Sequence, residues 1–142
     1  MDAHRQFRIF GCYWRDVSAI AENCYKMMPN HDVEHMISVG VRNDRVIGAM
    51  LVASGTRDTV SFDVRDALTW PAFSHCEKMI MVHNHPESFV HGIKFPLHPS
   101  NADLLATVQV ARLSSVIGIG MEDHLVIDSS EVFSIRQKVG LG

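Results

Sequence analysis

Val82-His83-Asn84-His85-Pro86, followed downstream by Pro99-Ser100-Asn101-Ala102-Asp103, is the most informative pair of stretches in this chain. Side chains on a β-strand repeat with period two, so His83 and His85 are expected to project the same way from an extended backbone. The apolar run Met79–Val82 before them predicts a buried strand that ends at a sheet edge. Two closely spaced imidazoles at a strand end, with a proline directly after them, favour a metal site over two chance histidines.

The second stretch adds a carboxylate at the start of a predicted helix. Ser100 followed three residues later by Asp103 is typical of a helix capping box. A metal-ligand role for Asp103 is compatible with capping, because the helix dipole keeps a carboxylate in the first turn ionised. Two histidine nitrogens and one carboxylate oxygen, with one position open, are how catalytic Zn²⁺ is held. The sequence therefore favours a Zn²⁺ site, with Ser100 able to cap the helix and still present its hydroxyl to a bound water.

Position alone does not choose the carboxylate that would act as acid and base beside such a metal. Glu34 opens the first predicted strand, where an exposed charge is the simpler interpretation. The competing carboxylates are Glu22, Glu77, Glu87, Glu122 and Glu131. His91 and His98 are expected to be solvated loop residues, with an accessory ligand role as the alternative. His124 is expected at the start of a strand, bonded to the backbone, and Cys76 is expected in the core.

Composition limits the function classes. The 142 residues are enough for one domain, expected over 1–142, and 46% hydrophobic with 20% charged residues is typical of a soluble globular protein. The net charge of −3 disfavours nonspecific nucleic-acid binding through a basic face. Three cysteines without a C-x-x-C pair indicate a reducing compartment, and we expect a cytoplasmic protein. The start of the chain has no apolar signal core, and runs such as Val46–Ala53 are too short to span a membrane.

Hydrophobic periodicity predicts alternating strands and helices, and therefore an α/β fold in which helices flank a mixed β-sheet. Asn43-Asp44 is predicted to form the turn of a hairpin. The predicted inner face of the long helix consists of Leu104, Leu105, Val108 and Ala111. Helices are expected at about 16–28, 63–74 and 100–114, and Pro71 leaves the second half of the middle helix open. Strands are expected at 34–42, 45–54, 59–64, 78–83, 115–119, 124–128 and 131–136. A loop is expected at 84–99.

The combined motif resembles the JAMM (MPN+) metalloprotease motif, His-x-His-Pro followed by Ser-x-x-Asp, and the asparagine between the histidines is similar to the RadC branch of that superfamily. Further RadC-like landmarks follow in the same order: Glu34-His35 with the hairpin to Gly55-Thr56, Arg65-Asp66 at a helix start, and Asp123–Ile127. The resemblance covers about residues 31–136. The helix-hairpin-helix region of full-length RadC relatives is not expected here, so no DNA-binding role is carried over from it.

This resemblance implies a JAB/MPN fold related to that of cytidine deaminases. Carried over by position, His83, His85 and Asp103 would ligate zinc, and Ser100 would bond the bound water and steady the oxyanion. The family's catalytic glutamate comes from the first strand after the N-terminal helix, and Glu34 matches that place. The segment 87–99 is longer than is usual for the family. It could cover the cleft, select substrate, or supply His91 or His98 to the metal.

The expected function is therefore that of a zinc-dependent metallopeptidase or isopeptidase, which hydrolyses an amide bond in a peptide or ubiquitin-like protein. One alternative is a noncatalytic MPN-type protein-binding module. Another is a metal-dependent nuclease-type role in DNA metabolism. A zinc deaminase would need His-x-Glu and Pro-Cys-x-x-Cys, and neither motif is present. The sequence leaves the natural substrate and the oligomeric state open.

Overall fold

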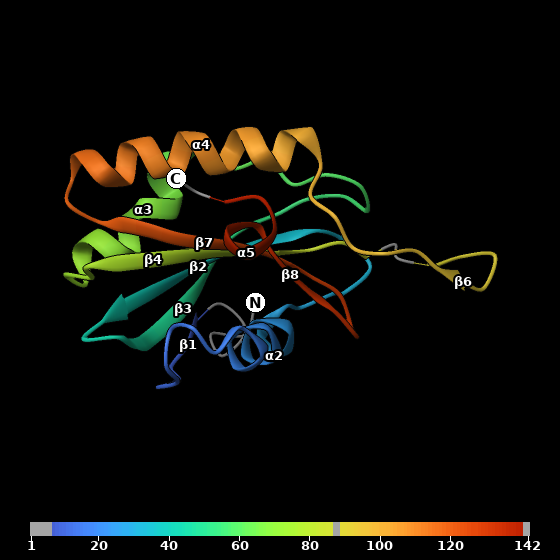
Figure 1. Cartoon of the computed structure of the whole chain (residues 1–142), viewed down its shortest axis with the longest axis horizontal. Coiled ribbons are helices and arrows are strands. Elements are labelled where there is room, and N and C mark those ends of the chain that lie inside the picture. The colour runs from blue at the N-terminus through green and yellow to red at the C-terminus, as the bar shows by residue number, and fades with distance from the viewer. Residues whose placement is uncertain (1–6, 87–88, 141–142) are drawn as a thin grey trace.

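The structure, a computed structural model, describes residues 7–86 and 89–140. Within these residues six strands form one mixed sheet in the order β1-β3-β2-β4-β7-β8, with helices on both of its faces (Figure 1). The predicted α/β fold is confirmed. The strands of the sheet are β1 (Phe7–Arg8), β2 (His35–Arg42), β3 (Arg45–Ser54), β4 (Lys78–Asn84), β7 (Gly120–Ile127) and β8 (Val132–Ser134). The helices are α2 (Val17–Met27), α3 (Val64–Phe73), α4 (Asn101–Val116) and α5 (Ile135–Lys138).

The central strand β4 determines where a site can form. It pairs antiparallel with β2 and parallel with β7. Parallel neighbours need a crossover connection, and α4 supplies it. The carboxyl ends of β4 and β7 therefore meet at one edge of the sheet, beside the first turn of α4 (Figure 1). In open α/β sheets, that edge is where ligands bind.

Alternation along β4 separates two hydrophobic cores. Ile80 and Val82 belong to the core that includes α2, on one face of the sheet. Met79 and Met81 belong to the core that includes residues of α3 and α4, on the other face. Because side chains alternate with period two, His83 continues the series that faces α4. Asn84, the next residue of β4, faces the side of the sheet that α2 covers.

The hairpin between β2 and β3 forms where the sequence predicts it. Asn43 and Asp44 have φ angles of 53° and 63°. Positive φ at both central residues is the requirement of a tight I′ hairpin turn, and asparagine and aspartate tolerate it better than most residues. The predicted strands at 34–42 and 45–54 are therefore confirmed.

Two predicted strands are wrong. Residues 59–64 contain no strand; Asp63 instead caps α3, its carboxylate accepting a hydrogen bond of 2.8 Å from the backbone N–H of Arg65. Residues 115–119 finish α4 and turn toward β7 through Gly118, whose φ is +78°. In both places short apolar runs fit a strand or a helix equally well, and tertiary context decides.

The predicted inner face of α4 is wrong in part, because Leu104 and Ala111 are half-buried but the other two residues are not. Leu105 and Val108 are 64% and 46% exposed, whereas the buried residues are Thr107, Val110 and Ser114. Threonine and serine can be buried here because each hydroxyl bonds to the preceding turn of the helix. Hydrophobicity counting ranks such residues as polar and so misplaces the buried stripe.

The predicted loop at 84–99 contains a short hairpin that projects from the body of the molecule (Figure 1). Its strands are β5 (Phe89–Val90) and β6 (Ile93–Lys94). His91 and His98 are both exposed, in agreement with the solvated interpretation. Among the described residues, no helix has both the length and the apolar character that crossing a membrane requires.

Candidate metal centre

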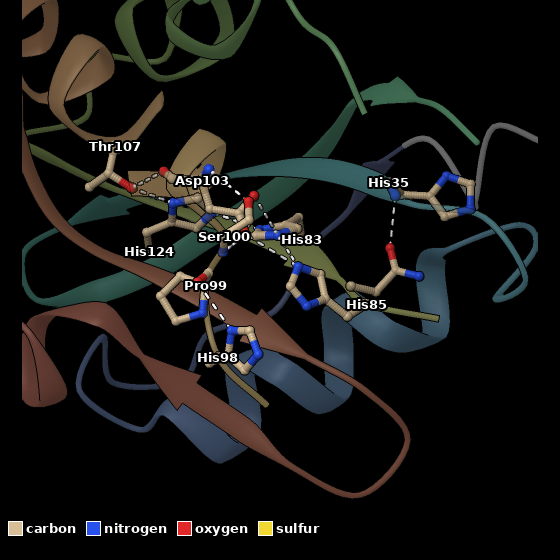
Figure 2. Close-up of polar contacts among 10 residues, drawn as sticks. His35, His83, His85, His98, Pro99, Ser100, Asp103, Thr107 and His124 are labelled. Atoms are coloured by element: carbon tan, nitrogen blue, oxygen red, sulfur yellow. Dashed lines mark hydrogen bonds and ion pairs between the residues drawn. The ribbon is translucent and has the colours of Figure 1, made fainter. Parts of the chain in front are cut away.

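His83 and His85 lie side by side at the carboxyl end of β4. The His85 backbone N–H donates to the carbonyl of Ile127 at 2.9 Å, which extends the pairing with β7 past the last residue of the strand. Both side chains therefore leave the same face, and their Nε2 atoms are 3.0 Å apart (Figure 2). The expectation that the two imidazoles project together is met.

Asp103 completes a triangle with the two histidines. Its Oδ1 is 3.2 Å from His83 Nε2, and its Oδ2 is 3.2 Å from His85 Nε2. The predicted capping box holds it there: the Asp103 N–H donates to Ser100 Oγ at 3.1 Å, and the Ser100 N–H donates to Asp103 Oδ2 at 2.8 Å. Capping thus aims this carboxylate at the end of β4.

Glu34 is not the exposed strand-end charge that its position alone suggests. It is 6% exposed, and its carboxylate lies with the His83 and His85 nitrogens in a group of candidate ligand atoms all within 4.8 Å of one another. Burial raises the pKa of Glu34 to about 7, opposed by His85 and reinforced by the negative charge of Asp103. A carboxyl group with this pKa can exchange a proton near neutral pH.

Asn84 holds the backbone on both sides of Glu34. Its Oδ1 accepts a hydrogen bond of 2.7 Å from the His35 N–H, and its Nδ2 donates to the Val33 carbonyl at 2.9 Å. Strand alternation turns Asn84 away from the histidines, toward the segment that carries Glu34. The residue between the two histidines therefore fixes where the glutamate lies.

The electrostatics favour an ionised carboxylate between two imidazoles. Burial alone would raise the pKa of Asp103, but the two imidazoles beside its carboxylate, His83 and His85, hold that pKa well below its ordinary value. Burial lowers the pKa of His83. Burial also acts to lower the pKa of His85, but Asp103 and Glu34 together raise it above the usual value. His83 is thus kept neutral, the form that can bind a metal.

His124 is a member of the site that the sequence did not reveal. It lies within β7 rather than at a strand start, is fully buried, and contacts side chains: its Nε2 is 2.7 Å from His83 Nδ1, and its Nδ1 is 2.6 Å from Thr107 Oγ1 (Figure 2). The expectation of a strand-start residue bonded to the backbone is wrong. The place of His124 in an apolar strand was the one available signal of burial.

The other candidates lie away from the centre. Four of the competing glutamates have partners elsewhere: Glu22 pairs with Lys26, Glu77 accepts from the Asn43 N–H, Glu122 pairs with Arg136, and Glu131 pairs with Lys94. Glu87 lies outside the described residues. The His98 ring bonds to the neighbouring Pro99 carbonyl at 3.3 Å, and Cys76 is buried in the core as expected.

An open cavity of about 390 Å³ lies over the centre. One wall is the loop that follows β3, and the other combines the first turn of α4 with the segment after β4. Glu34, His85 and Asp103 all reach its surface. Its lining residues are Glu34, Arg57, Asp58, Thr59, Val60, His85, Pro86, Ser100, Ala102 and Asp103.

The donor set suits Zn²⁺. In a tetrahedral site with bonds of about 2.0–2.1 Å, neighbouring donor atoms are about 3.3 Å apart. The two histidine Nε2 atoms are 3.0 Å apart, and each lies 3.2 Å from a different oxygen of the Asp103 carboxylate, close to that spacing. Lone pairs on both of these nitrogens would repel at 3.0 Å, and either a shared proton or a bound cation would relieve that contact. These three residues could therefore hold the metal, with the cavity on its open side.

Fold and site together define an α/β domain with a candidate metal centre at the carboxyl end of its central strand. The family model described as "RadC-like JAB domain" matches residues 14–141. The chain therefore belongs to the RadC-like JAB domain family, and its mixed sheet with flanking helices is a JAB/MPN fold.

Curated relatives carry the name UPF0758 protein. One from Finegoldia magna is 26% identical over 123 residues, which cover 86% of this chain and 52% of the relative. One from Clostridium botulinum is 25% identical over 140 residues, covering 94% of this chain and 58% of the relative. One from Latilactobacillus sakei is 31% identical over 84 residues, covering 59% of this chain and 34% of the relative. The chain thus spans about half the length of the first two of these proteins and about a third of the last.

Proposed function

We propose that this protein is a zinc-dependent hydrolase of amide bonds, a peptidase or isopeptidase of the JAMM type. One observation carries the proposal: His83, His85 and Asp103 converge at 3.0–3.2 Å beside the buried Glu34, and the group opens into a cavity. Two nitrogen ligands, one carboxylate ligand and an open position are the arrangement of catalytic zinc.

Each residue has a distinct role in this proposal. His83, His85 and Asp103 would hold Zn²⁺, which when bound supplies a Lewis acid and lowers the pKa of water to about 7. Glu34 accepts a proton from the attacking water and delivers it to the leaving amine, a task that suits its pKa of about 7. The Ser100 hydroxyl accepts the capping bond and keeps its own proton, which it donates to the developing oxyanion.

The cavity supports a proposal for the class of substrate. A volume of about 390 Å³ suits a short extended segment rather than a folded surface. Arg57 and Asp58 line it and offer both signs of charge to such a segment. A peptide or the tail of a ubiquitin-like protein fits this description. We also propose a cytoplasmic location, which is supported by three free cysteines, Cys12, Cys24 and Cys76.

The test separates metal binding from catalysis. Elemental analysis of the purified protein should find zinc, and a fluorogenic peptide library should reveal metal-dependent cleavage. Glu34→Gln should retain zinc and lose at least about 100-fold in rate, because general acid–base catalysis contributes about 10²–10⁴-fold. If this variant cleaves as fast as the wild type, Glu34 is not the base.

The same preparation decides between the rival functions. Protein that contains no zinc after incubation with the metal would point to a noncatalytic MPN-type binding module. Metal-dependent cleavage of single- or double-stranded DNA, with no peptide cleavage, would point to the nuclease-type role. Metal-free protein is the control for both assays.

A further inference from the structure

A line of polar groups runs beneath His83 and takes no part in the chemistry above. His124 on β7 and Thr107 on α4 are 0% and 2% exposed. His83 Nδ1 is 2.7 Å from His124 Nε2, His124 Nδ1 is 2.6 Å from Thr107 Oγ1, and Thr107 Oγ1 is 2.8 Å from the Asp103 carbonyl oxygen (Figure 2). The line begins on one proposed ligand and ends on the backbone of another.

The carbonyl at the end of the line gives it a direction. A carbonyl oxygen only accepts, so the single hydroxyl proton of Thr107 points to Asp103. The hydroxyl oxygen of Thr107 must then accept from His124, whose Nδ1 therefore carries the proton. A neutral imidazole has one ring proton, so His124 Nε2 accepts from His83 Nδ1. His83 Nε2 is left with a lone pair.

That lone pair points to the place where the metal is proposed. His83 Nε2 is the atom that lies 3.0 Å from His85 Nε2 and 3.2 Å from the Asp103 carboxylate. If His124 carried its proton on Nε2 instead, His83 would have to accept at Nδ1 and would place its own proton between the ligand atoms. A doubly protonated His124 is disfavoured by its burial, because neither of its ring contacts is with a carboxylate.

We propose that Thr107 and His124 are positioning residues that fix the tautomer of His83, so that Nε2 is free to bind the metal. This inference rests on the zinc site proposed above. Histidine ligands of metals usually donate their second ring N–H to a carboxylate, a backbone carbonyl or water. Here the carbonyl is reached through two side chains. One helix, α4, thus provides the Asp103 carboxylate and also orients His83.

The first test measures zinc affinity by competition with a chromophoric chelator. Thr107→Val keeps the side-chain shape and removes the hydroxyl, so His124 loses the acceptor that fixes its proton. Loss of an outer partner of a histidine ligand lowers metal affinity by about 10–100-fold, and we expect a decrease in that range. Thr107→Ser restores the hydroxyl and should restore the affinity.

Thr69→Val is the matched control. Thr69 Oγ1 makes the same kind of bond, 2.7 Å to the carbonyl of Arg65 one turn back, but on the exposed surface of α3. Its loss measures the effect of removing a helical hydroxyl alone and should leave zinc affinity unchanged. Thr107→Val binding zinc as tightly as the wild type would overturn the inference.

The second test needs neither metal nor activity. Ring ¹⁵N chemical shifts in metal-free wild-type protein distinguish the two imidazole tautomers, and both His83 and His124 should be protonated at Nδ1. A His124 proton on Nε2 contradicts the inference even if the affinity test agrees. If the wild type binds no zinc, the proposed function fails, while the ring shifts still decide the tautomer.

Discussion

Asp103 uses one carboxylate for two kinds of interaction, with the helix start and with the histidines. Asp103→Ala should therefore reduce zinc content to well below one ion per chain and also cost about 1 kcal/mol of stability through loss of the cap. Asp63→Ala is the control, because Asp63, the N-cap residue of α3, also accepts a backbone hydrogen bond at a helix start but lies away from the centre. Elemental analysis and urea unfolding measure the two effects. Unchanged zinc stoichiometry in Asp103→Ala would leave the residue with the capping role alone.

His35 gives a residue-scale prediction for pH. It is buried between Ser54 and Asn30, and burial lowers its pKa below 6.5. Below pH 6.5 the unfolded chain binds a proton at His35 more readily than the folded protein does. The contribution of His35 to the free energy of unfolding is therefore fully present above about pH 6.5 and falls with decreasing pH. The limiting slope is about 1.4 kcal/mol per pH unit.

The measurement compares the wild type with one variant, because the raised pKa values of Glu34 and His85 make the protein more stable as the pH falls, opposite to the effect of His35. Urea unfolding of metal-free wild type and of His35→Gln at pH 7.5 and 5.5 removes those shared contributions. The wild type should lose more stability than the variant on acidification. Equal losses in the two proteins would show that His35 titrates normally.

The parts of the site that the sequence reveals are those close together along the chain. His83, His85 and Asp103 could be proposed as a group because a strand repeat and a capping signal place each of them locally. The burial of Glu34 and the role of His124 could not, because their contacts depend on how distant segments pack. The bond between His83 and His124, for example, joins residues 41 positions apart.

At the scale of elements, turn chemistry and long apolar runs were reliable guides, whereas short apolar runs were not. The β2–β3 hairpin and β4 form where the pattern predicts them, because positive-φ residues and a strand buried on both faces have few alternatives. The run at 59–64 is instead loop up to the first residue of α3, and the run at 115–119 contains the end of α4 and a turn. Their conformation follows from the packing of α3 and α4, which no short window contains.

The loop after β3 forms a wall of the cavity and depends on Gly55. A Cβ added there would overlap the Thr59 carbonyl oxygen, a backbone atom that can move only if the loop moves with it. Gly55→Ala should displace this loop, cost about 1–3 kcal/mol of stability and slow hydrolysis while zinc remains bound. Gly11→Ala, with nothing within 4 Å of the added atom, is the control. Thermal unfolding and zinc content check the result; wild-type behaviour would mean that the loop relaxes freely.

At the scale of the whole molecule, the proposed ligands come from β4 and from the start of α4, and Glu34 comes from the segment before β2. The proposed metal site therefore forms only when the sheet and its crossover have assembled, so zinc should bind the folded state alone. Ligand linkage predicts about 4 kcal/mol of added stability at a free zinc concentration 1,000 times Kd. Unfolding midpoints with and without zinc measure this, and Asp103→Ala should show a much smaller shift. Equal midpoints for the wild type would contradict the linkage.

Because β4 sends alternate side chains to opposite faces, its alignment with β2 affects the proposed metal ligands and the proposed base together. Met36 lies opposite His83, and Ile37 opposite Val82. A slip by one residue would turn the imidazoles toward α2 and Asn84 toward α4, which would remove the ligands and release Glu34 in a single event. A misaligned strand would therefore give an entirely inactive molecule rather than a partly active one, and intermediate activity could arise only from mixtures of aligned and misaligned chains.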